Sequence, residues 1–344
     1  MSGIEMLSTL SSPLELLGQL GHIFYFIVLP MLVLAGIGYL VQKKVGLDRH
    51  TLKALNFYFV MPGMIYYSIL TSKMTVSQVG TVVVFALTLL VSMVLVTALV
   101  AKLRGIPRRY RNTMVMTTML FNSGNFGLPL QERAFHHAGL SSDATGMQAL
   151  VMITQNLFTF TVGILIAAGG RKERHWKENL LHIAKLPPIY ALTAAVLTVQ
   201  VRNGLSGVSP SLGDAVEPWW KVVVYVKEAF FGVALLTLGA QLATVQRGKD
   251  RYPIRWSVFM RLLVGPLIAL GIIYAFGVSG FIAQVLLIAS SAPTAVNCML
   301  LCLEFDNNPD YAATAVFYSS LLSPVTVTLV IFFAQGGFLP GFSF

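Results

Sequence analysis

The chain has 344 residues, of which 56% are hydrophobic and only 11% are charged, and its mean hydropathy is positive. This composition lies far outside the range of soluble globular domains, so it excludes the water-soluble function classes and predicts an integral membrane protein. The formal net charge of +10 does not indicate nucleic-acid binding, because the basic residues occupy short connectors between apolar runs.

The first 21 residues contain two glutamates and no Lys or Arg, so they lack the basic leading region of a cleavable signal peptide. We expect residues 1–21 to form an external lead-in. Ten apolar runs follow, each long enough for a helix to cross a bilayer, which needs about 20 residues. The runs cover residues 22–42, 51–71, 77–101, 112–135, 145–168, 180–201, 219–244, 255–277, 279–303 and 311–334. The sequence therefore predicts an all-α integral membrane protein with ten transmembrane helices.

Basic residues gather in alternate connectors. The connectors after the first, third, fifth and seventh runs, together with the adjoining ends of the runs, hold 19 of the 24 Lys and Arg residues. Because Lys and Arg near span ends favour the cytoplasmic side, we expect these connectors inside the cell. Both termini, including residues 335–344 as a short tail, then lie outside a multi-pass protein of the cytoplasmic membrane.

The connector of residues 169–179 is the most polar join near the middle of the chain, and it separates residues 22–168 from residues 180–334. With five spans in each half, the second half enters the membrane from the opposite side. This is the arrangement of an inverted-topology repeat. The sequence thus predicts two inverted five-helix repeats, with Pro129 and Pro293 at corresponding places.

The fourth and ninth runs are each interrupted by Asn and Pro, from Asn122 to Pro129 (NSGNFGLP) and from Pro293 to Asn297 (PTAVN). Gly has a low helix propensity, and Pro lacks an amide hydrogen and collides with the carbonyl one turn earlier. We therefore expect carbonyls near residues 125–126 and 289–290 to lose their helical partners. Unwound backbone survives in a bilayer only where protein buries it or a water-filled cavity touches it. The two breaks predict a solute site.

If these two helices cross at their breaks, the amino end of one half-helix, with its partial positive charge, lies beside a carboxyl end. An anion can dock there without a Lys or Arg, and the amides of Asn122, Asn125 and Asn297 can donate to a carboxylate. The alternative is that the prolines only kink the helices and that Asn joins neighbouring helices. Two matched breaks, each with Asn, favour the transport site.

The segments from Asn122 to Pro129 and from Ser291 to Leu329, with LLTLGAQLA at residues 235–243, resemble the auxin efflux carrier family of membrane transporters. The resemblance covers essentially the whole chain and implies a bile acid/sodium symporter-like fold. In such a fold the first, second, sixth and seventh spans form a scaffold that mediates homodimerisation, and the broken fourth and ninth spans cross in a transport domain. The central join is short, unlike that of the plant hormone exporters. We therefore expect a compact prokaryotic relative, for which the hormone is a doubtful substrate.

The substrate-site candidates combine the two breaks with two polar residues of the fifth run. They are Asn122, Asn125, Gly127, Pro129, Gln155, Asn156, Pro293, Thr294 and Asn297. Among them the family resemblance implies Asn122, Asn125, Pro129, Pro293 and Asn297. Gln155 and Asn156 either contact substrate or hydrogen-bond to a neighbouring helix.

Ionisable residues inside later runs are further candidates, because a charge in hydrocarbon is costly. Lys227 and Glu228 lie in the outer third of the seventh run. They form structural ion pairs with neighbouring residues, or Glu228 carries a proton in coupling or gating. Arg261 lies near the inner end of the eighth run, and we expect it to snorkel to the cytoplasmic surface.

The predicted function is secondary transport of a small organic anion by alternating access, with an auxin-like indole carboxylate or a small dicarboxylate as substrate. Neither crossing helix carries an Asp or Glu at mid-membrane, so uniport is the first hypothesis, and proton or sodium coupling is the alternative. A channel or receptor fits an inverted repeat less well. An intramembrane enzyme is disfavoured, because no nucleophile and base converge in the runs. No cofactor, metal site or nucleic-acid partner is predicted, and Cys298 and Cys302 show no metal-ligand spacing.

Overall fold

A computed structural model describes residues 13–168, 186–204, 211–245 and 253–343. These residues form helices joined by short loops, and their one β contact is an isolated bridge between Phe121 and Thr294. Six helices are long and apolar enough to cross a membrane. They are Leu14–Val45, Val76–Leu103, Ser141–Ala167, Glu217–Ala243, Ile254–Ala275 and Pro309–Gln335. The prediction of an all-α, multi-pass membrane protein is confirmed at this level.

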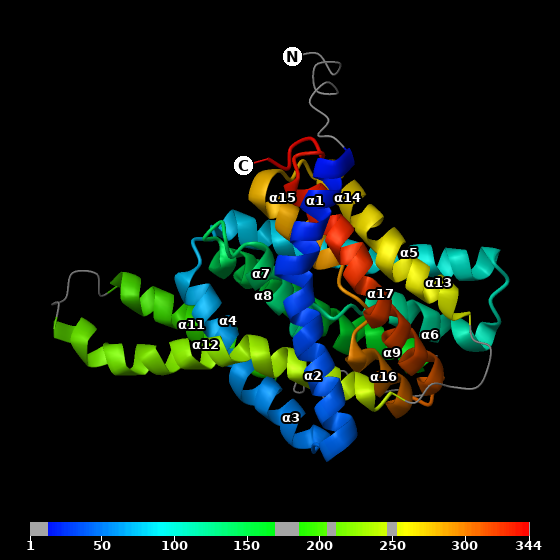
Figure 1. Ribbon diagram of the computed structural model, residues 1–344, viewed down its shortest axis with the longest axis horizontal. Helices are drawn as coiled ribbons and strands as arrows, with labels where there is room; N and C mark the ends of the chain where they lie inside the picture. The colour runs from blue at the N-terminus through cyan, green and yellow to red at the C-terminus, as the bar shows by residue number, and fades with distance from the viewer. Residues whose placement is uncertain (1–12, 169–185, 205–210, 246–252, 344) are drawn as a thin grey trace, which may run out of the picture.

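Many of the helices are interrupted by short π-helical turns (η) or by loops (Figure 1). The first half contains α1 (Pro13–Ile23), η1 (Phe24–Val28), α2 (Leu29–Val45), α3 (Arg49–Leu55), η2 (Asn56–Val60), α4 (Met61–Thr71), α5 (Val76–Leu103), α6 (Arg108–Met119), η3 (Ser123–Gly127), α7 (Leu128–Ala134), α8 (Ser141–Phe158), η4 (Thr159–Gly163) and α9 (Ile164–Ala168). The second half contains α11 (Pro187–Gly204), α12 (Ser211–Ala243), α13 (Ile254–Phe259), η5 (Met260–Val264), α14 (Gly265–Ala275), α15 (Gly280–Ser290), α16 (Val296–Glu304) and α17 (Pro309–Gln335).

Two helices begin earlier than the apolar runs indicated. Helix α1 continues through η1 into α2, so residues 13–21 form the first turns of a long helix. Helix α12 begins at Ser211, well before residue 219. The connector expected at residues 169–179 lies outside the described residues.

Among the described residues, four of the five π-helical turns lie directly before a helix with proline as its second residue. These prolines are Pro30, Pro62, Pro129 and Pro266. The proline ring collides with the carbonyl of the preceding turn and provides no amide hydrogen, so a regular α-turn cannot continue through it. A wider π-turn accommodates the ring, and the local sequence therefore determines where these helices are distorted.

Helices α2 and α12 cross with their backbones in direct contact (Figure 1). A Cβ at Gly38 would overlap the backbone of Leu236, and a Cβ at Gly239 would overlap the carbonyl oxygen of Ala35. Small residues permit such close approach of membrane helices. Helix α4 packs on both α11 and α12, so α2, α4, α11 and α12 form one packed group.

The other helices surround the two broken segments. Helix α5 packs on α6, α8 and α14, and α17 packs on α15 and α16. Apolar side chains such as Phe85, Leu286 and Ile288 are completely buried within this second group. Helix α8 also packs on α4 and so connects the two groups. The first turns of α1 and the segment after α17 lie at the same end of the molecule (Figure 1).

Candidate substrate site at two broken helices

The two breaks predicted from sequence meet each other. Helix α6 ends at Met119 and η3 begins at Ser123, while α15 ends at Ser290 and α16 begins at Val296. The unwound segments run antiparallel and share the isolated bridge. The amide of Asn122 donates to the carbonyl of Pro293 at 2.7 Å, and the amide of Ala295 donates to the carbonyl of Leu120 at 2.9 Å. Four helix ends therefore meet around one short stretch of paired backbone.

The two prolines occupy different places relative to their breaks. Pro293 lies inside the break between α15 and α16, whereas Pro129 is the second residue of α7, after η3. The unwound residues of the fourth run are 120–122, and the π-turn η3 covers residues 125–126, where the loss of helical partners stays a prediction. The π-turn accommodates Pro129, and the backbone unwinds earlier, where Phe121 pairs with Thr294.

Side chains satisfy much of the freed backbone. Gln155 Nε2 donates to the carbonyl of Phe121 at 2.8 Å, and Thr294 Oγ1 donates to the carbonyl of Thr117 at 2.8 Å. Gln148 Nε2 donates to the carbonyl of Ser123 at 2.8 Å. Two other predicted residues therefore lie at the break. Gln155 reaches it from α8, and Thr294 is one of the two residues of the bridge.

Gly127 is needed where η3 passes α8. A Cβ at this position would overlap Nε2 of Gln148, which is the atom that donates to Ser123. A larger residue would displace that donor and leave a buried carbonyl without a partner. This contact gives the predicted residue Gly127 a packing role.

Arg261 on η5 is completely buried. Its Nη1 donates to the carbonyl of Thr118 at 3.0 Å, and its Nη2 donates to the carbonyl of Ser290. The guanidinium carbon also lies 5.0 Å from the centroid of the Phe121 ring. The expectation that Arg261 snorkels to the surface is wrong, because helix carboxyl ends and an aromatic face stabilise its charge inside the protein.

Arg261 lies where it can balance the partial negative charges of the two helix carboxyl ends at the crossing. Each helix carboxyl end carries roughly half a negative charge, so two ends together offset about one positive charge. One guanidinium thus links the ends of α6 and α15 and neutralises them. The amino ends of η3 and α16 keep their partial positive charge.

The asparagines of the two breaks differ in their surroundings. Asn122 is 7% exposed, and its Nδ2 is buried with no hydrogen-bond acceptor among the described residues. Asn125 is half-buried, and its Oδ1 accepts from Nδ2 of Asn56 at 2.7 Å. Asn156 is half-buried and Asn297 is exposed, and neither side chain hydrogen-bonds to another described residue. The structure therefore places Asn122 at the bridge and Asn125 further along η3, beside Asn56, and it gives the side chains of Asn156 and Asn297 no hydrogen bond to another described residue.

Asn56 is not among the predicted site residues, because it lies near the start of the second run, where a polar residue is ordinary. It is buried in η2, and its Oδ1 has no donor among the described residues. The hydrogen bond to Asn125 links the α4 segment to the crossing.

The ionisable pair of α12 is also arranged differently from the expectation. Lys227 Nζ lies 2.8 Å from Oε1 of Glu132 on α7. Glu228 is exposed and is not the partner. Glu132 is not among the predicted site residues, although a carboxylate inside an apolar run, three residues after Pro129, indicates a functional candidate.

Cys298 and Cys302 are buried free thiols on α16. No group of three metal-binding side chains occurs among the described residues.

Residues 23–331 match the family described as membrane transport protein. The chain belongs to this family. It is therefore a membrane transporter and not an enzyme.

Two relatives of this transporter are similar over nearly their whole length, and a third is similar over a shorter segment. An uncharacterized transporter of Methanothermobacter thermautotrophicus is 25% identical over 319 residues, covering 88% of this chain and 95% of the relative. A putative malonate transporter of Rhizobium meliloti is 25% identical over 321 residues, covering 91% of this chain and 97% of the relative. Auxin efflux carrier component 1 of Arabidopsis thaliana is 28% identical over 116 residues, covering 32% of this chain and 18% of the relative. The predicted resemblance to auxin efflux carriers is confirmed.

Proposed function

We propose that this transporter carries a small organic anion and binds one of its carboxylates beside the bridge between the broken helices. The observation that carries the proposal is the amide of Asn122. Its Nδ2, at the amino end of η3, is a buried donor that has no acceptor among the described residues. A carboxylate oxygen would accept this hydrogen bond, and a buried donor that gains an acceptor no longer carries its desolvation cost.

The charges around the crossing favour a single carboxylate. Because Arg261 offsets the carboxyl ends of α6 and α15, the amino ends of η3 and α16 are left to attract an anion. Two amino ends contribute about one positive charge together, which one carboxylate balances. The amide nitrogen of Asn125 is a second donor, since only its carbonyl oxygen is held by Asn56.

The substrate class follows from this site and from the relatives. A small dicarboxylate such as malonate or malate is the first choice, since a relative named as a putative malonate transporter aligns with 91% of this chain. An indole carboxylate is the second choice, because the aromatic residues Phe121, Phe126 and Phe158 are buried near the break.

The mechanism that we propose is uniport by alternating access in a protein with ten spans and two inverted five-helix repeats. The packed group of α2, α4, α11 and α12 supports a scaffold that forms a homodimer, and the broken helices belong to the moving part. With the inside negative, export of one negative charge gains about 2.3 kcal/mol per 100 mV, so no coupled ion is needed.

Binding of carboxylates to the purified protein tests the function. We expect malonate, malate or indole-3-acetate to raise the melting temperature, because a ligand that binds only the folded state stabilises it. Asn122→Ala should raise the Kd for the carboxylate roughly 10- to 100-fold, because it removes a hydrogen bond to a charged group. Asn125→Ala and Asn297→Ala should reduce transport. Asn112→Ala, in the first turns of α6, is the matched control and should bind normally. Normal binding and transport in all three site variants would refute the site.

The orientation of the termini is a separate prediction. The described ends of the chain lie at one end of the molecule, as an even number of crossings requires (Figure 1). A reporter fused after Phe344 should be accessible from outside the cell, because the basic connectors favour the cytoplasm. A cytoplasmic signal would contradict both this orientation and the count of ten spans.

A further inference from the structure

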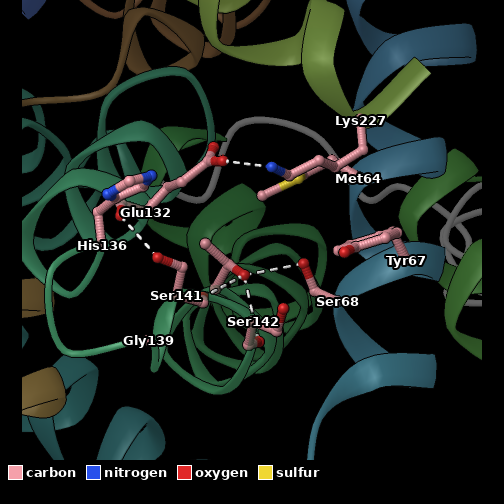
Figure 2. A pocket seen from close by; sticks show the side chains of 10 residues that line it. Met64, Tyr67, Ser68, Glu132, His136, Gly139, Ser141, Ser142 and Lys227 are labelled. Carbon is pink, nitrogen blue, oxygen red and sulfur yellow. Dashed lines mark hydrogen bonds and ion pairs between the residues drawn. The ribbon is translucent and has the colours of Figure 1, made fainter. Parts of the chain in front are cut away.

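A polar cavity of about 230 Å³ lies between α4, α7, α8 and α12 (Figure 2). Its wall includes Tyr67 and Ser68 from α4, Glu132 from α7, Thr145 from α8 and Lys227 from α12. Ser68 Oγ and Thr145 Oγ1 lie 2.8 Å apart and share a hydrogen bond. The cavity thus combines one ammonium, one carboxylate and several hydroxyl groups.

An ion pair between Lys227 and Glu132 lines one side of this cavity (Figure 2). Lys227 Nζ lies 2.8 Å from Glu132 Oε1 and 5.7 Å from the centroid of the Tyr67 ring. Glu132 is only 9% exposed, and its Oε2 is buried with no hydrogen-bond donor among the described residues. The ammonium therefore satisfies one oxygen of the carboxylate, and the other oxygen is a buried acceptor that has no donor among the described residues.

We propose that this cavity is a second anion site, at which a carboxylate of the transported anion binds Lys227 while Glu132 takes up a proton. The inference rests on the proposed function, because it takes the transported anion as its ligand. The site is distinct from the bridge. Glu132 lies on the half-helix that begins beside Asn122, seven residues beyond Asn125 and therefore about 10 Å further along it.

The proton follows from the charge balance. One ammonium can balance one carboxylate in a buried place, and two carboxylates that share a site cannot both remain ionised. An incoming carboxylate therefore replaces Glu132 as the ionised partner of Lys227, and one proton from solution binds Oε2 of Glu132. The neutral acid then offers an O–H donor to the bound anion, beside the hydroxyls of Ser68 and Tyr67.

We assign the proposed proton uptake to Glu132 because the other charged and titratable groups near the cavity are exposed or have other partners. The His136 side chain lines the cavity and is exposed to solvent. Asp143 on α8 accepts from the Ser72 hydroxyl and from the amide of Lys73. Arg133 donates to the carbonyl of Phe26. Of the described residues that line the cavity, Glu132 is the one carboxylate and Lys227 the one permanent cation.

Isothermal titration of malonate into the full-length protein between pH 5.5 and pH 8, in buffers of different ionisation enthalpy, tests the proposal. We expect uptake of about one proton for each anion that binds in the cavity at the upper end of this range, with affinity for this site rising about tenfold for each unit fall in pH. Glu132→Gln should bind without proton uptake and without this pH dependence. Glu217→Gln, at an exposed glutamate of the same helix α12, is the matched control and should behave like the wild type.

The double variant Glu132→Gln, Lys227→Met removes both charges together, so it leaves no unpaired charge in the cavity. We expect it to lose binding at the cavity and to keep any binding at the bridge. Unchanged proton uptake in Glu132→Gln, or an unchanged binding isotherm in the double variant, would overturn the second site. Binding that is independent of pH in the wild type but lost in Asn122→Ala would overturn this inference and leave the proposed function intact. Absence of carboxylate binding at every pH would overturn both.

Discussion

Replacement of Arg261 by Met should lower the free energy of unfolding by about 2–6 kcal/mol and abolish transport. The variant removes the guanidinium that donates to the carbonyls of Thr118 and Ser290. Both carbonyls are inside the protein, because the Arg261 side chain that contacts them is fully buried. Each buried acceptor left without a donor costs about 1–3 kcal/mol. The carboxyl ends of α6 and α15 would also lose their shared positive charge, so the crossing itself would loosen.

Unfolding of purified variants in SDS titrations measures this loss. Arg261→Lys keeps the charge but offers a single ammonium in place of a planar fork, so we expect it to recover only part of the stability. Arg255→Lys, an exposed change on the neighbouring helix α13, is the control and should stay within about 0.5 kcal/mol of the wild type. Wild-type stability in Arg261→Met would show that the guanidinium does not hold the two helix ends.

Gly239→Ala should destabilise the protein by about 3 kcal/mol or more, although a single methyl group is added. The new Cβ would overlap the carbonyl oxygen of Ala35, and its other close neighbour is the amide of Tyr39. Overpacking usually costs about 1–3 kcal/mol when side chains can move aside, and here the obstacles are backbone atoms of α2. The two helices would have to separate along their crossing.

Gly232→Ala on the same helix is the matched control, because a Cβ there meets no atom within 4 Å. Alanine is the better helix former by about 1 kcal/mol, so this variant should be as stable as the wild type or slightly more stable. Equal stability of the two alanine variants in the same SDS titration would show that α2 and α12 do not touch at Gly239.

Much of this protein could be predicted from local chemistry. Hydropathy alone predicts the class of the protein, because a run of about 20 apolar residues has few stable alternatives to a membrane helix. The segment from Asn122 to Pro129 and the segment from Pro293 to Asn297 carry the helix-breaking residues, and breaks occur at or near both. The same segments carry the resemblance that the family match confirms.

The exact position of the fourth break was beyond local reasoning. Pro129 predicts a distortion one turn before itself, and η3 is found there. The unwound residues lie earlier in the chain, because the backbone at Phe121 gains a partner from Thr294, in a segment far away in sequence. Helix propensity depends on the local sequence alone, so it cannot predict a partner from a distant segment.

Charge partners were likewise decided by the tertiary structure. Sequence spacing placed Arg261 near a surface and paired Lys227 with its neighbours, whereas the fold brings Arg261 to two helix ends and Lys227 to Glu132. A buried charge is stable only with the partner that compensates its desolvation, and that partner can stand anywhere in the chain. Local chemistry was therefore sufficient to predict a membrane transporter with two interrupted helices. The pairing of the interruptions and of the charges is visible only in the fold, because both depend on contacts between residues that are distant in sequence.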